Sequence, residues 1–164
     1  MKGLLQFLGT LTLSLLLSTF LGGQSSNHTS GNGAGASIST GDYLVMVGDS
    51  AGNNNNTGSH NVFLGKATGW NNTSGSRNIF IGMGAGRWSS NDHDNIGIGY
   101  LSLGGVAHQD VAAGSGFAGS AGTPTGDENI AIGSRTLEDL TSGTDNTIIG
   151  DEAGRELVID KTQQ

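Results

Sequence analysis

The sequence predicts an all-β fold, a parallel β-solenoid of about seven 17-residue coils. The first observation behind this prediction is a glycine that recurs at every seventeenth position, and the second is a short aliphatic phrase before most of these glycines. The glycines are Gly48, Gly65, Gly82, Gly99, Gly116, Gly133 and Gly150. A fixed period of this length is typical of stacked structural repeats, in which each turn meets the same backbone requirement at the same place.

The phrase before each glycine reads as a short strand, as in Asn61-Val62-Phe63-Leu64-Gly65. Its second and fourth residues share one face, because side chains alternate along a strand. We expect these residues to fill the interior of the solenoid and the glycine to end the strand. The predicted inward residues are Val45, Val47, Val62, Leu64, Ile79, Ile81, Ile96, Ile98, Ile130, Ile132 and Ile149.

The third residue of each phrase is then expected to face outward. Its column contains the apolar residues Met46, Phe63, Phe80 and Ile148. A contiguous apolar stripe on a surface usually marks an interface. These four residues are therefore the predicted interface, through which identical chains would associate or, alternatively, a hydrophobic ligand would bind.

A column of asparagines opens the phrase in five coils, at Asn61, Asn78, Asn95, Asn129 and Asn146. We interpret it as structural, because stacked amides can hydrogen-bond from coil to coil and to the turn backbone. In the column before it, stacking would place Arg77 beside Asp94, and Glu128 beside Asp145.

The chain divides by composition into four segments. Residues 1–25 resemble a secretory signal peptide, with an uncleaved membrane anchor as the alternative. Residues 26–42 are rich in Ser, Asn and Gly and predict a flexible linker. Residues 43–160 form the repeat domain, within which 103–128 keep the glycine phase without the aliphatic residues and predict a degenerate coil. Residues 161–164 are a short C-terminal tail.

The composition argues against several classes of function. The 164 residues include no cysteine, which excludes disulfides and thiol chemistry. The net charge of −7 argues against a nucleic-acid partner. The four histidines are scattered through polar turns, so we expect no catalytic site, no enzyme activity and no cofactor. Weak candidates for a calcium-like ion are Asp92, Asp94, Asp127 and Asp145, which could equally belong to solvated turns.

The asparagine-led phrase, followed by a small residue three positions after the glycine (Ala51, Thr68, Ala85), resembles the head repeats of trimeric autotransporter adhesins of the YadA type. It is also similar to 17-residue asparagine-rich repeats of tail-fibre-like secreted proteins. The resemblance covers roughly residues 43–160. It implies a left-handed β-roll, commonly trimeric, that serves in surface attachment.

We therefore expect a secreted or cell-surface, non-enzymatic module with an adhesive or structural role. Its expected partner is itself, as a homotrimer, and a host or surface macromolecule is a further candidate. No membrane contact is expected once the signal peptide is cleaved. The alternatives are a subunit that stacks end to end into an extracellular filament and, with less support, an ice-binding protein.

Overall fold

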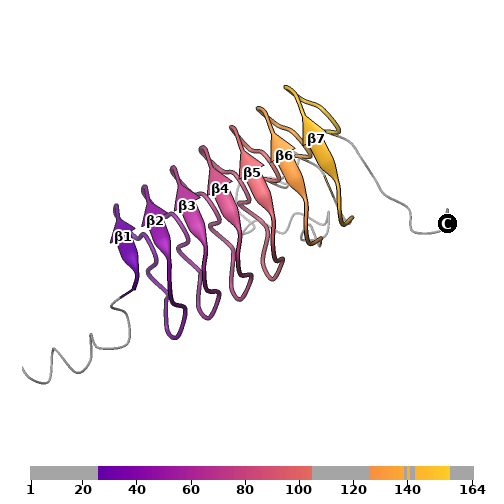
Figure 1. Ribbon diagram of the computed structural model, residues 1–164. Coiled ribbons are helices and arrows are strands. Elements are labelled where there is room, and N and C mark those ends of the chain that lie inside the picture. Colours follow the sequence, from indigo (N-terminus) through magenta and orange to yellow (C-terminus); the bar gives the residue numbers. More distant parts are fainter. Residues whose placement is uncertain (1–25, 105–125, 139, 141–142, 156–164) are drawn as a thin grey trace, which may run out of the picture.

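The computed structural model describes residues 26–104, 126–138, 140 and 143–155. Within them the chain forms one sheet of seven parallel strands in sequence order, stacked into a solenoid of about six turns (Figure 1). The strands are β1 (His28–Ser30), β2 (Val45–Val47), β3 (Val62–Leu64), β4 (Ile79–Ile81), β5 (Ile96–Ile98), β6 (Ile130–Ile132) and β7 (Thr147–Ile149). The predicted all-β solenoid is confirmed. The described residues contain no helix long and apolar enough to cross a membrane.

The strand pairing follows the sequence period. Val45 in β2 pairs with Val62 in β3, one repeat period later, and the same step joins β3 to β4 and β4 to β5. The glycine after each strand has a positive φ, such as 133° at Gly48. A Cβ placed on Gly48 would lie 2.5 Å from the carbonyl oxygen of Gly65 in the next coil. Glycine is therefore required there both by its dihedral angle and by the close stacking of the coils.

The predicted assignment of the two strand faces is wrong. The middle residue of each strand points into the coil: Met46, Phe63, Phe80 and Ala131 are fully buried, and Ile148 is partly buried. The flanking aliphatic residues that were expected inside are exposed or half-buried instead. The coil is narrow, and the interior of each strand consists of one central side chain rather than two. Met46, Phe63, Phe80 and Ile148 are thus core residues and not an interface.

Each coil balances the size of this inward residue against the fourth residue after the strand-ending glycine. Where the strand carries Phe80, the opposite position is Gly86, whose Cβ would lie 2.3 Å from the phenyl ring. Where the strand carries Ala131, the opposite position is Leu137, which is fully buried. The remaining pairs are Met46 with Gly52, Phe63 with Gly69, Gly97 with Leu103 and Ile148 with Gly154. This exchange keeps the interior filled at constant width.

The predicted linker over residues 26–42 is also wrong, because these residues form the first coil. β1 pairs in register with β2, and Asn27 donates from Nδ2 to the carbonyl oxygen of Gly41 at 2.7 Å. The solenoid therefore begins at least one coil earlier than the predicted boundary at residue 43. The predicted segments 1–25, 156–160 and 161–164 lie outside the described residues.

Most of the degenerate coil predicted over 103–128 lies outside the described residues, which end at Gly104 and resume at Gly126. β5 pairs directly with β6, joining Ile96 to Ile130 across two repeat periods. Leu103, which follows β5, is buried in the core, and its backbone N–H donates to the carbonyl oxygen of Thr136, which follows β6. Gly116 lies outside the described residues.

Candidate functional site

The outward face of the sheet carries two parallel columns of aliphatic side chains. They are the first and third residues of the strands, and those that are exposed include Val45 (37%), Val47 (38%), Ile79 (36%) and Ile149 (68%). Figure 1 shows the strands β2 to β7, which carry these columns, stacked side by side in sequence order. A continuous apolar surface on a rod that is otherwise rich in Asn, Ser and Gly makes this face the main candidate for an interaction surface among the described residues.

The sequence contained a signal for this face. Both alternating sets of strand residues are apolar, so hydrophobicity alone did not distinguish inside from outside. The inward set is the one whose size varies, from Gly97 to Phe80, and varies inversely with a second position in the same coil. The outward set keeps a nearly constant aliphatic size. A reciprocal size pattern identifies residues that share a closed space.

The asparagine column forms a buried ladder between coils. The backbone N–H of Asn78 donates to Oδ1 of Asn61 at 2.9 Å, and that of Asn95 donates to Oδ1 of Asn78 at 3.0 Å. The side-chain amide of Asn78 donates to the carbonyl oxygen of Asp92 at 2.7 Å. The same pattern continues through Asn129 and Asn146, and Asn27 makes the equivalent bond two coils before Asn61, with Leu44 at the position between them. The amides therefore satisfy backbone groups at the corner of every described coil except that of β2.

Charged and aromatic side chains stack along the adjacent edge of the strand face. The rings of Tyr43 and His60 are stacked at 4.8 Å between centroids. The Arg77 guanidinium makes a bidentate pair with Asp94, at 2.6 and 2.7 Å, as the sequence predicted. The hydrogen bond from Arg77 lowers the pKa of the Asp94 carboxyl below its ordinary value. Both side chains are well exposed, so the pair contributes little to stability.

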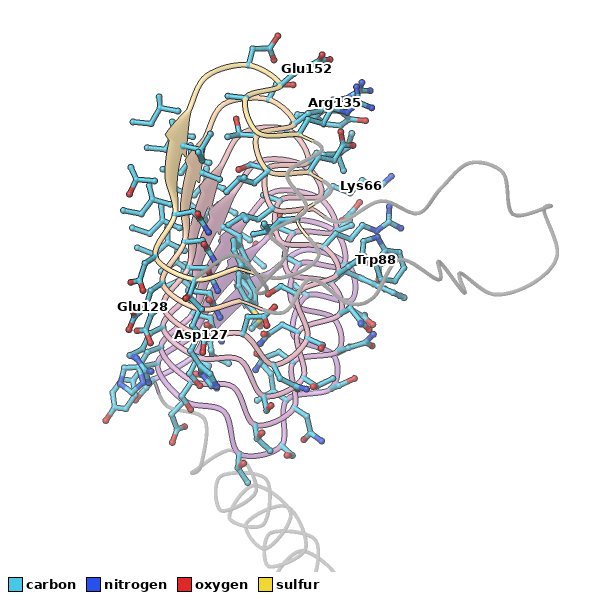
Figure 2. The ribbon with its side chains drawn as sticks, turned by 90° about the vertical axis from the view of Figure 1, so that its right-hand side faces the viewer. Lys66, Trp88, Asp127, Glu128, Arg135 and Glu152 are labelled. Carbon is cyan, nitrogen blue, oxygen red and sulfur yellow. The ribbon has the colours of Figure 1, made fainter. Side chains whose placement is uncertain are left out.

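Further along this edge, carboxylates lie beside one another. A hydrogen bond with Asp145, followed by the charge of Asp145, raises the pKa of Glu128. Glu128 and Asp127 project on the strand side of the molecule in Figure 2. Asp127 accepts a hydrogen bond from the backbone N–H of His93 at 2.7 Å. In the part of the chain that the structure describes, no three His, Asp or Glu side chains are placed to hold a metal ion.

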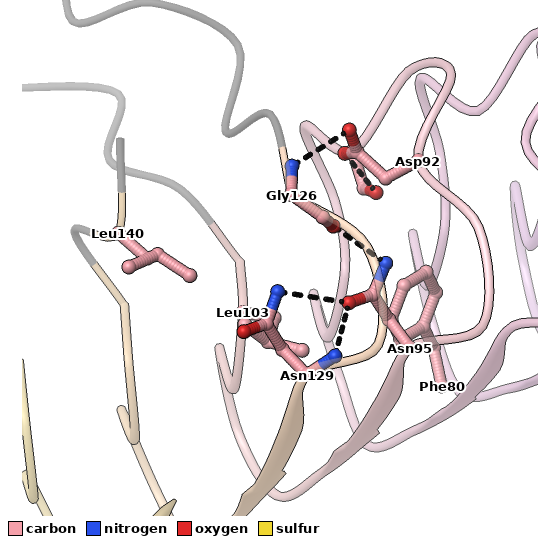
Figure 3. A pocket seen from close by; sticks show the side chains of 8 residues that line it. Phe80, Asp92, Asn95, Leu103, Gly126, Asn129 and Leu140 are labelled. Carbon is pink, nitrogen blue, oxygen red and sulfur yellow. Dashed lines mark hydrogen bonds between the residues drawn. The ribbon is translucent and has the colours of Figure 1, made fainter. Parts of the chain in front are cut away.

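Asp92 differs from the other acidic residues of this edge because it is buried. It occupies the position held by Gly58 and Gly75 in the preceding coils. Its carboxylate accepts hydrogen bonds from Ser89 Oγ at 2.6 Å and from the backbone N–H of Gly126 at 3.1 Å (Figure 3). Burial is the main cause that raises the pKa of Asp92. The adjoining cavity is about 10 Å³ and is lined by residues that include Phe80, Leu103 and Leu140, which leaves room for at most about one water molecule.

The last described coils carry a network of opposite charges on the side away from the strands. Arg155 lies 3.1 Å from Glu138, and Arg135 lies 3.7 Å from Glu152. Arg135 and Glu152 appear at the upper end of Figure 2. The guanidinium of Arg135 also lies 5.9 Å from the centre of the Tyr100 ring. These contacts join neighbouring coils and do not converge on a cleft.

Comparison with known proteins adds no assignment to this geometry. No protein-family model, no curated protein sequence and no solved structure matches the chain. The similarity to adhesin head repeats therefore remains a resemblance of the repeat phrase, and the fold stands on the strand pairing described above.

Proposed function

We propose that this chain is a secreted, non-enzymatic solenoid rod that self-associates through its strand face and serves as an adhesive or structural module. The observation that carries the proposal is the pair of outward aliphatic columns on β2 to β7. Removing such side chains from water stabilises a complex by about 25 cal/mol per Å² of apolar area. The resemblance to adhesin heads implies an assembly of three copies with these faces together.

Several features support a binding or structural role over catalysis. Three of the described carboxylates have structural partners: Asp94 pairs with Arg77, Asp92 with Ser89, and Glu138 with Arg155. The cavity beside Asp92 is too small for a substrate. The asparagine ladder makes the rod regular along its length, as a spacer or a repeated attachment surface requires. Secretion is proposed from the signal-like sequence of residues 1–25.

Sedimentation velocity of the mature protein tests the self-association. We expect the parent protein to sediment as a trimer at micromolar concentration. The double variant Ile79→Lys with Ile81→Lys should sediment as a folded monomer, because it places two charges on the apolar face of each chain. The control is Met83→Lys, which changes a side chain of 49% exposure beyond the strand and should leave the trimer intact. Circular dichroism would verify that the parent and both variants fold.

A monodisperse monomer of the parent protein would contradict the proposal, as would equal dissociation of the trimer in the control variant.

A second candidate, end-to-end polymerisation, is favoured by the edges of β1 and β7, which are the two ends of the described sheet. Asn27 and Asn146 occupy equivalent places at these ends, so the ladder could continue into another copy. Filaments would sediment as a broad, fast distribution and would be visible by negative-stain microscopy.

A further inference from the structure

Both tryptophans of the chain lie together on neighbouring coils. The rings of Trp70 and Trp88 meet edge to face, with 5.5 Å between centroids and an interplanar angle of 80°. The Arg87 guanidinium carbon lies 5.9 Å from the centre of the Trp70 ring and 5.3 Å from that of Trp88. We call these three residues the tryptophan cluster. All three are half-buried, and Trp88 projects from the flank opposite the strands in Figure 2.

The core does not require this cluster. The interior of the same coils is filled by Phe63 and Phe80, whose rings stack at 5.5 Å. The cluster occupies the fifth and sixth positions after the strand-ending glycine, which in the coil of β2 are asparagines. Two large aromatic side chains at partly exposed turn positions are typical of binding surfaces, where Trp and Arg are enriched.

Asparagines lie in the coils next to the cluster: the backbone N–H of Asn54 donates to the carbonyl oxygen of Trp70, and that of Asn71 donates to the carbonyl oxygen of Arg87, both at 3.0 Å. Asn53, Asn54 and Asn71 are the equivalent residues of the adjacent coils and are partly exposed. The amide of Asn54 lies 3.4 Å from Oδ1 of Asn71, so these side chains form a short row beside the cluster. Lys66 projects from the same flank in Figure 2. The surface thus combines two indole rings, a guanidinium and a row of amides.

We propose that the tryptophan cluster binds an oligosaccharide that carries carboxylates, such as a uronate chain. The apolar C–H face of a pyranose ring would pack on an indole, the Arg87 guanidinium would pair with the carboxylate, and the asparagine amides would meet the hydroxyls. A cationic ligand is disfavoured because Arg87 already lies over both rings. Double-stranded nucleic acid is disfavoured by the net charge of −7, because a duplex carries one negative charge per about 1.7 Å of its axis, a higher density than one carboxylate per sugar.

This inference deepens the proposed attachment function, since it names the chemistry of the surface to which the rod would attach. It concerns the flank opposite the strand face, so the two proposals can fail separately. If the protein is a trimer but does not bind the glycan, only the present inference is overturned. A monomer that binds the glycan would overturn only the self-association.

Intrinsic tryptophan fluorescence gives a direct test, because the only two tryptophans are in the cluster. The probe is tetragalacturonate, and the neutral reference is maltotetraose. We expect a saturable change with tetragalacturonate, weakened by added NaCl, and at least tenfold weaker apparent affinity in Arg87→Gln. Arg87→Lys should recover only part of the affinity, because lysine cannot make the bidentate pair.

The matched control is Arg135→Gln, which removes the same charge from a second arginine–aromatic contact among the described residues and should not change the affinity. Thermal unfolding followed by circular dichroism would show that each variant is folded at the assay temperature. The proposal is overturned if the folded parent protein shows no saturable change up to about 10 mM probe, a range that covers even millimolar affinity. An equal response to maltotetraose, or an equal loss in Arg135→Gln, would overturn it as well.

Discussion

At the scale of single residues, the corners of the coils need a side chain that can both donate and accept hydrogen bonds, and asparagine occupies most of them. The asparagine that precedes every described strand except β2 makes hydrogen bonds to the backbone of two coils, which explains why an amide recurs there: a carboxylate could not donate and an aliphatic residue could do neither. This role could be predicted from the sequence, because the residue type and its spacing repeat together. The first member, Asn27, was missed because residues 26–42 are so rich in Ser, Asn and Gly that their phase was uninformative.

Asp92 gives the residue-scale prediction. Because burial raises the pKa of Asp92 in the folded state, the contribution of Asp92 to the free energy of unfolding is most favourable in acid and declines as pH rises from the ordinary value of 3.8 through the folded pKa. In Asp92→Asn, Oδ1 can still accept from Gly126 and the amide can donate to Ser89 Oγ. We expect the variant's stability, relative to the parent, to increase across this interval and then level off. Urea unfolding at several pH values measures the difference, and parallel profiles would contradict the assignment.

At the scale of the elements, the period predicted the strands well and the faces badly. Each strand is only three residues long, and strands such as β3 have apolar side chains on both faces, so alternation defines two columns without showing which one is enclosed. Which column is enclosed depends on the width of the coil, and that width is set by the turns. The extra repeat period between β5 and β6 was similarly beyond reach, because glycine spacing alone does not show which segments pair.

The size balance within a coil gives the element-scale prediction. Gly86→Leu alone should destabilise severely, since even its Cβ would lie 2.3 Å from the Phe80 ring. Phe80→Ala alone should cost about 3–5 kcal/mol through the cavity it leaves. The double variant reproduces the Ala131 and Leu137 pair of a later coil, where leucine already has a φ of 51°. It should therefore be more stable than the sum of the single changes, by about 1 kcal/mol or more in a double-mutant cycle of urea unfolding; additive effects would contradict the shared space.

At the scale of the whole molecule, the rod has two kinds of surface. The strand face is aliphatic and repetitive and suits another copy of the same rod. The opposite flank is polar, with the tryptophan cluster near its middle and the network of Arg135, Glu152 and Arg155 toward the last coils. Under the two proposals, the chain would assemble through one side and bind its ligand through the other.

The most direct test of the account uses the absence of cysteine from the sequence, which allows single cysteines to be placed at will. Ile81→Cys lies in the outward aliphatic column and Phe80→Cys in the inward one. Under mild oxidation of the folded protein, the account predicts disulfide-linked pairs of chains for Ile81→Cys and none for Phe80→Cys, as read from a non-reducing gel. Cross-linking of Phe80→Cys, or its absence in Ile81→Cys, would contradict the claim that the rod associates through the outward columns of its strand face.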